Sequence, residues 1–132
     1  MEAVPTGIEY VDGRLLVTLF RGVPFAPGTS TVVQIDPGTG EQTAFISGLK
    51  TAIDIIALRH DGGYLVLQHS SGPGPFFGGP GVVLHFESPT SAPELVADCL
   101  VRPTSMTLDE KAGLLYVTEL LSGRLVALEI GE

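Results

Sequence analysis

The sequence of 132 residues contains no tryptophan, no asparagine and only one cysteine, Cys99. A single cysteine excludes an internal disulfide and any metal site built from several cysteines. The longest apolar stretch, 52–58, carries Asp54 and falls well short of the ~18 residues that a membrane-spanning helix needs. Basic residues are also scarce, because seven Lys and Arg stand against 15 Asp and Glu and form no cluster. The composition therefore predicts neither a membrane span nor a nucleic-acid partner.

Short apolar runs separated by turn-forming residues dominate what the sequence does contain. With 44% apolar residues, the chain is large enough for one domain with a hydrophobic core. Its 17 glycines and 10 prolines separate strand-like runs such as 15–20, 31–35 and 42–46. Residues 36–40, Asp-Pro-Gly-Thr-Gly, have the composition of a tight turn. Helical spacing is not sustained anywhere, and 109–112 is expected to be a loop, so the sequence predicts an all-β chain.

The sequence also repeats itself with a period of about fifty residues. A glycine before a strand-like run recurs as Gly13, Gly63 and Gly113. The aligned segments around these glycines are 12–19, 61–68 and 111–119, and the strands that follow them are 32–35, 82–86 and 125–129. A fourth strand is expected at 43–46 and 94–97 in the first two repeats, and the third repeat stops before one.

Four short strands per repeat of this length are typical of a β-propeller blade. We therefore predict one partial propeller domain over residues 1–132, with blades at about 4–50, 51–101 and 102–132, the last incomplete. The alternative is a β-sandwich of about eleven strands. Because propellers close with about four to eight blades, the remaining blades are expected from the same longer chain or from a second copy. The first residues, Met-Glu-Ala-Val-Pro, carry no signal-peptide features.

Four stretches of the sequence resemble the ScyD family, which is named for the scytonemin biosynthesis cluster. They are 5–8, the loop 22–28, the turn 33–38 and 48–55. The resemblance implies the C-terminal half of a six-bladed propeller similar to NHL and SMP-30 proteins, with the tail from Pro103 to Glu119 as the last blade. Because members of that family commonly carry an export signal, it also implies a secreted, extracellular or periplasmic location. The family has no well-established reaction, so the resemblance implies a fold more than an activity.

The polar residues expected nearest a propeller axis are Asp54, Gln68, His69 and Glu119. Asp54 lies on the first strand of its repeat, and the others lie at or just after the ends of second strands, where propellers bind ligands. Two carboxylates and an imidazole would suit calcium or zinc, or acid–base chemistry. Alternatively, these side chains are solvated or bonded to one another in a wet channel.

Two loops, 21–30 and 70–81, are longer than the corresponding turn of the third repeat. Both combine proline with aromatic residues, namely Phe25 in the first and Phe76 and Phe77 in the second. Insertions at one position of a repeat project from one face, which is often the binding face. These phenylalanines are therefore expected to contact a ligand, to cover the channel, or both.

Two functions follow from these patterns. The first is a non-enzymatic propeller scaffold that binds a small molecule or a protein. The second is a hydrolase of the SMP-30 or gluconolactonase type, which uses a divalent cation, with calcium as the expected ion. The absence of asparagine removes a ligand type that such hydrolases use, so the sequence favours the scaffold. No serine nucleophile motif and no phosphate-binding loop is found.

Overall fold

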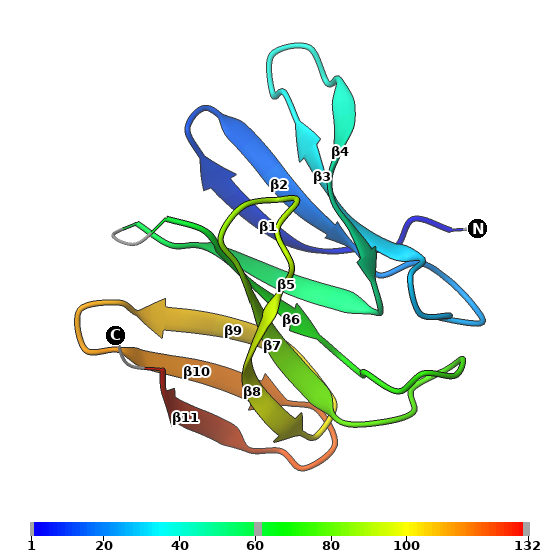
Figure 1. Ribbon diagram of the computed structural model, residues 1–132, viewed down its shortest axis with the longest axis vertical. Coiled ribbons are helices and arrows are strands. Elements are labelled where there is room, and N and C mark those ends of the chain that lie inside the picture. Colours follow the sequence, from blue (N-terminus) through cyan, green and yellow to red (C-terminus); the bar gives the residue numbers. More distant parts are fainter. Residues whose placement is uncertain (1, 60–61, 131–132) are drawn as a thin grey trace.

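The computed structural model describes residues 2–59 and 62–130, so residues 60 and 61 of the second repeat and the last two residues lie outside the described part. Within it, eleven strands form three antiparallel sheets and there is no helix, which confirms the all-β prediction. The sheets follow one another along the chain and lie one above the next in Figure 1. The described residues therefore contain no helix long and apolar enough to cross a bilayer.

Each sheet is a simple meander in which every strand pairs with the next strand of the chain. Sheet 1 contains β1 (Pro5–Val11), β2 (Arg14–Leu19), β3 (Ser30–Ile35) and β4 (Gln42–Leu49). Sheet 2 contains β5 (Ala52–Ala57), β6 (Tyr64–Gln68), β7 (Gly81–Phe86) and β8 (Glu94–Leu100). Sheet 3 contains β9 (Pro103–Asp109), β10 (Leu114–Glu119) and β11 (Leu125–Glu129).

The repeated glycine stands in the first hairpin of each sheet. Gly13, Gly63 and Gly113 have φ angles of 80°, 85° and 69°. Side chains with a Cβ adopt this left-handed conformation only at a cost, whereas glycine adopts it freely. The fifty-residue recurrence therefore reflects a left-handed glycine just before the second strand of each sheet, in hairpin loops of different length.

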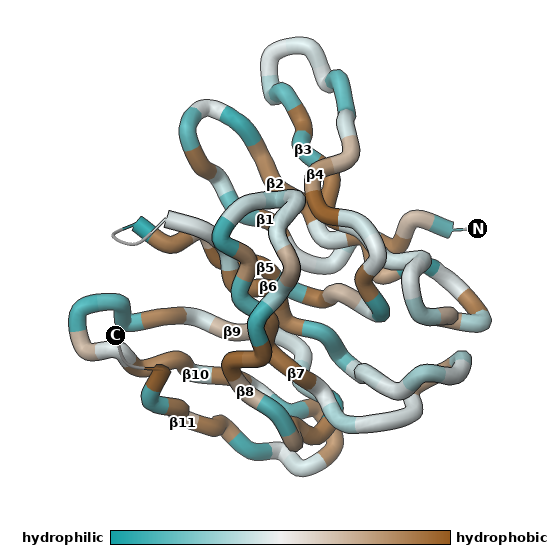
Figure 2. Tube along the Cα trace, in the orientation of Figure 1, coloured by the Kyte–Doolittle hydropathy of each residue, from teal (hydrophilic) through white to brown (hydrophobic). Residues whose placement is uncertain are grey.

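Apolar side chains are concentrated in the two seams between successive sheets. The seam between sheets 1 and 2 buries Leu16, Val32, Ile46, Ile55, Val66 and Phe86. The seam between sheets 2 and 3 buries Leu65, Leu67, Val83, Met106, Leu115 and Val117. Strand β5 supplies the central contacts, because it packs against β1 and β2 on one side and β9 on the other. In Figure 2 the most apolar residues lie mainly on the strands, whereas many of the turns that join them are hydrophilic or intermediate in hydropathy.

The two seams have different residues, and different contacts, where the third strand of one sheet meets the first strand of the next. In the first seam, the Ser30 hydroxyl donates to the Leu19 carbonyl at 2.6 Å and accepts the Ala52 N–H at 2.9 Å. In the second seam, Gly81 and Pro103 occupy the positions of Ser30 and Ala52. Proline has no N–H to satisfy, and a Cβ on Gly81 would lie only 2.4 Å from the Pro103 ring. Glycine and proline at these positions therefore fit each other, as serine and alanine do in the first seam.

Candidate functional site

One end of the three sheets carries the long loops and the crossovers between sheets. We call this end the loop face: it comprises the β2–β3 loop (20–29), the β6–β7 loop (69–80), the β10–β11 loop (120–124) and the crossovers 50–51 and 101–102. The two long loops lie on the right in Figure 1. They are joined directly, because the Phe76 N–H donates to the Pro24 carbonyl at 2.7 Å.

The backbone of the loop face is built from a repeated bond. The residue that leads into the first strand of each sheet has a positive φ, namely 51° at Val4, 46° at Thr51 and 48° at Arg102. Its carbonyl accepts the N–H of the residue after the second strand, which is Phe20, His69 or Leu120. Left-handed backbone at residues with a Cβ costs about 1 kcal/mol or more and persists only where the surroundings enforce it. The chain thus fixes the start of each loop at the same point of every sheet.

An aromatic cluster fills the space between the two long loops. The Phe25 and Phe77 ring centroids are 4.7 Å apart, and both rings contact Phe20, at 5.5 and 6.0 Å. His69 joins the cluster at 5.1 Å from Phe77 and 5.8 Å from Phe20. Phe76 lies at its edge, 6.3 Å from Phe25, and remains 53% exposed. The loop phenylalanines therefore do two things: Phe25 and Phe77 cover Phe20 and His69, while Phe76 presents its ring to solvent.

His69 is held as a neutral imidazole. Its Nδ1 lies 2.8 Å from the Pro103 carbonyl, which can only accept, so Nδ1 carries the proton. Burial of the ring lowers the pKa of His69, and the positive charge of Arg102 lowers it further, against the opposing effect of the Pro103 bond. Nε2 consequently keeps a lone pair, which can accept a hydrogen bond or a proton.

Two cations attach the β6–β7 loop to the crossovers. Lys50 is buried, and its Nζ donates to the Gly72 and Gly74 carbonyls at 2.8 Å each. Burial, followed by the charge of Arg102, lowers the pKa of Lys50. Arg102 donates to the Phe77 and Gly79 carbonyls and lies over the Phe77 ring, 5.7 Å from its centroid. Sequence reasoning missed both residues. A usable signal was present, because the chain has only seven basic residues and two of them stand at successive crossovers.

Gln68 and Glu119 serve equivalent structural roles in sheets 2 and 3. Gln68 Oε1 accepts the Lys50 N–H at 3.2 Å, and Glu119 Oε2 accepts the Val101 N–H at 2.8 Å. Each side chain therefore ties the end of a second strand to the crossover that precedes its sheet. The corresponding position of sheet 1 is Leu19, which makes no such side-chain bond.

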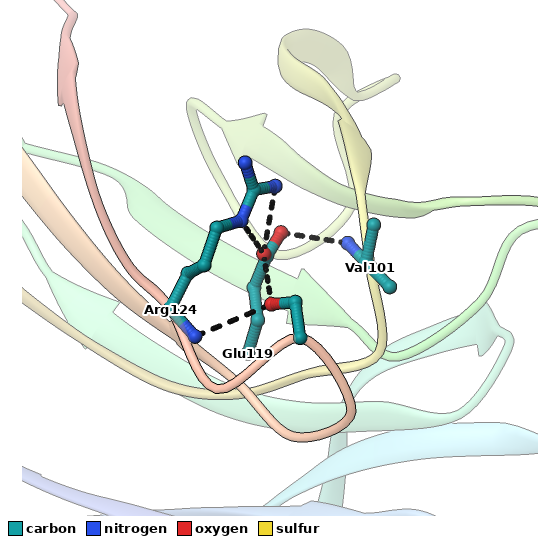
Figure 3. Close-up of polar contacts among 4 residues, drawn as sticks. Val101, Glu119 and Arg124 are labelled. Carbon is teal, nitrogen blue, oxygen red and sulfur yellow. Dashed lines mark hydrogen bonds and ion pairs between the residues drawn. The ribbon is translucent and has the colours of Figure 1, made fainter.

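Glu119 is the more heavily bonded of the two (Figure 3). Its Oε1 accepts Ser122 Oγ at 2.7 Å and Arg124 Nε at 3.0 Å, and Arg124 Nη2 lies 2.9 Å away. The Val101 N–H is the largest influence that lowers the pKa of Glu119, and Ser122 and Arg124 add to it. The carboxylate is thus ionised and fully engaged within the protein.

Asp54 lies in the seam between sheets 2 and 3. Its Oδ2 accepts the Met106 N–H of β9, and its Oδ1 accepts the N–H of its neighbour Ile55, both at 2.9 Å. Burial raises the pKa of Asp54, the nearby Glu9 raises it slightly, and the two backbone bonds oppose the increase. Asp54 therefore joins two inner strands.

The four polar candidates do not share one set of contacts. Gln68 and His69 are adjacent on the loop face, Glu119 bonds the next crossover, and Asp54 bonds the middle of β9. Across residues 2–59 and 62–130, no group of three or more His, Cys, Asp or Glu side chains is arranged to hold a metal ion. Chemically, the loop face offers the exposed Phe76 ring, which lies at the edge of the aromatic cluster on loops fixed by cations. Comparisons of the chain with protein-family models and with curated proteins find no match.

Proposed function

We propose that the three sheets are consecutive blades of a six-bladed β-propeller and that the protein is a non-enzymatic scaffold whose loop face binds a ligand. Three features support the blade assignment: meanders that begin about fifty residues apart, apolar seams between successive sheets, and first strands that lie next to one another. The sequence resemblance to the ScyD family points to the same architecture. In such folds the loops over the inner strands carry the binding site.

The observation that carries the binding role is the aromatic cluster on the loop face, which we call the platform and which presents Phe76 on fixed loops. Lys50 and Arg102 attach the β6–β7 loop, and the Phe76–Pro24 bond attaches that loop to its neighbour. An exposed phenylalanine on a loop fixed in this way loses little conformational freedom on binding, which favours affinity. Leu120 and Leu121, 63% and 74% exposed, extend the apolar surface on the third loop.

The chemistry of the platform selects a ligand with a flat aromatic group. A ring of this kind stacks edge-on or offset against phenylalanine, with about 0.5–1.5 kcal/mol per pair beyond the burial of area. His69 is only 6% exposed and supports the cluster from beneath Phe77, so the exposed Phe76 ring is the part that meets the ligand. The aromatic group of the ligand could belong to a small molecule or to a side chain of a protein partner.

The hydrolase alternative has less support. It needs carboxylates free to coordinate a cation, whereas Asp54 and Glu119 each accept backbone N–H groups at separate places on either side of the start of β9. No described contact favours it over the scaffold.

Titration with indole, followed by amide chemical shifts in ¹H–¹⁵N NMR, tests the proposal. Indole is a flat aromatic ring, so shifts are expected in residues 20–29 and 69–80. Phe76→Ala should weaken binding severalfold, and Leu95→Ala, which removes an aliphatic side chain of similar 59% exposure on β8, should not. Shifts scattered over all three sheets, or equal effects of the two variants, would overturn it.

A further inference from the structure

Sheet 1 has an apolar face that no described sheet covers. Side chains alternate between the two faces of a strand, and Glu9 reaches across to accept the Ala57 N–H of sheet 2. Register therefore puts Ile8 and Tyr10 of β1 on the opposite face, paired with Val17 and Leu15 of β2. Ile8 is 63% and Tyr10 66% exposed. We call this surface the receiving face; it comprises Ile8, Tyr10, Leu15, Val17, Val33 and Ile35.

The same register positions are core in the other two sheets. In sheet 2 they are Ile55, Ala57, Tyr64, Val66, Leu84 and Phe86, and in sheet 3 they are Met106, Leu108, Leu115, Val117, Val126 and Leu128. Ile55, equivalent to Ile8, is 2% exposed, and Met106, at the same position of sheet 3, is 9% exposed. The receiving faces of sheets 2 and 3 thus each lie against the preceding sheet.

The molecule also shows what covers a receiving face. The covering positions, on the opposite side of the preceding sheet, are Leu16, Thr18 and Val32 in sheet 1 and Leu65, Leu67 and Val83 in sheet 2. In sheet 3 the equivalent residues are Tyr116, Thr118 and Leu125. Thr118 repeats the threonine at Thr18, and Leu125 is 67% exposed. The chain therefore carries one open receiving face and one open covering face, and the covering positions Thr118 and Leu125 repeat the threonine and the apolar residue at Thr18 and Val32.

We infer that the receiving face of sheet 1 binds the covering face of sheet 3 in a second copy of this chain. The contact is reciprocal, because sheet 3 of the first copy simultaneously covers sheet 1 of the second. Two copies then form a closed ring of six sheets with two-fold symmetry, in which every receiving face meets a covering face. The inference rests on the proposed blade arrangement but not on ligand binding at the loop face.

Sedimentation equilibrium of the 132-residue chain is the first test. The expected species has twice the monomer mass of 13.8 kDa. A monomer at micromolar concentration, or open assemblies that grow without limit, would overturn the inference. If the dimer forms and indole fails to bind, the ligand proposal fails and the ring remains.

Matched variants identify the surfaces. Ile8→Glu and Leu125→Glu each put a carboxylate into one side of the seam, so each should weaken dimerisation about tenfold or more. Leu95→Glu makes the same chemical change at a site 59% exposed on the outer strand of sheet 2 and should leave the dimer intact. Because the three sites are exposed, folding should survive, and circular dichroism checks this.

A mixture of the two disruptive variants distinguishes the proposed ring, in which sheet 1 of each copy meets sheet 3 of the other, from a dimer in which two identical faces meet. In the mixed pair one seam joins the unaltered Leu125 of one copy to the unaltered Ile8 of the other. The mixture should therefore contain dimer that neither variant forms alone at the same concentration. A dimer that loses stability with Ile8→Glu but not with Leu125→Glu would mean that two receiving faces meet, and would overturn the inference.

Discussion

Glu119→Gln is the most informative single change on the loop face. The equivalent residue of sheet 2 is already glutamine, and Gln68 Oε1 holds a crossover N–H as Glu119 Oε2 does. The substitution should therefore preserve the bond to Val101, remove the charge, and replace the Oε1 acceptor of Ser122 and Arg124 by an NH2 group that cannot accept. The variant measures how much free energy the ionised carboxylate contributes beyond the hydrogen bond to the crossover N–H, which an amide also accepts.

The expected loss follows from the contacts. Hydrogen bonds to charged groups contribute about 1.5–3 kcal/mol and neutral ones about 0.5–1.5, so losing the charge at the Val101 bond costs about 1 kcal/mol. The Arg124 side chain is 61% exposed, which limits its pair with Glu119 to less than about 1 kcal/mol. The free energy of unfolding at neutral pH should therefore fall by about 1–2 kcal/mol, or about five- to thirtyfold in the folding equilibrium.

The pH dependence gives a second signature. The folded-state pKa of Glu119 is below its ordinary value of 4.5, so the unfolded chain takes up a proton first as the pH decreases. The stabilisation by the carboxylate is complete above pH 4.5 and is lost as the pH falls through the folded-state pKa. Glutamine does not titrate, so the difference in the free energy of unfolding between the two proteins should become smaller in acid.

Urea denaturation at pH 7 and near pH 3 measures both effects. Glu129→Gln, at an exposed position of β11, is the matched control and should change stability by less than about 0.5 kcal/mol. Equal stability of Glu119→Gln and the unaltered protein at pH 7, or a difference that persists unchanged in acid, would refute the reasoning.

Three further predictions concern the other polar groups. Lys50→Met removes the ammonium bound to the Gly72 and Gly74 carbonyls, so amide hydrogen exchange in residues 69–80 should accelerate about tenfold. Lys111→Met, at an exposed position, is the control and should leave these exchange rates unchanged. Because the folded-state pKa of His69 is lowered from 6.5, the unfolded state gains the proton first and stability should decrease as the pH falls below about 6.5; His69→Gln should reduce this slope in urea titrations. Calcium should leave the thermal midpoint unchanged, and a rise that Asp54→Ala abolishes would contradict the scaffold and support the hydrolase.

The sequence predicted the strands because they depend on local pattern. The runs 15–20, 31–35 and 42–46 match β2, β3 and the first part of β4, and the glycine recurrence marked the same hairpin three times. β4 extends to Leu49 because its pairing with β3 resumes after register shifts, at Ser30 and Leu49. Such bulges depend on the neighbouring strand and leave no clear trace in the apolar pattern.

Side-chain partners were less predictable. Alignment put Asp54 on a first strand and Gln68 and Glu119 at the ends of second strands, and the registers confirm those positions. The bonds these residues make could not be anticipated, because Met106 lies 52 residues beyond Asp54 and offers a backbone group. Lys50 and Arg102 were overlooked for a related reason: their acceptors are glycine and phenylalanine carbonyls in a loop without regular structure.

The unlike seams also make the two inner junctions non-interchangeable. Tandem repeats of similar sequence are prone to docking on the wrong neighbour. Here, a first strand that begins with proline would leave the Ser30 hydroxyl without its Ala52 donor. A serine in place of Gly81 would collide with the Pro103 ring. Sheet 3 therefore cannot take the place of sheet 2 against sheet 1 without the loss of a hydrogen bond, which favours the observed order of these sheets.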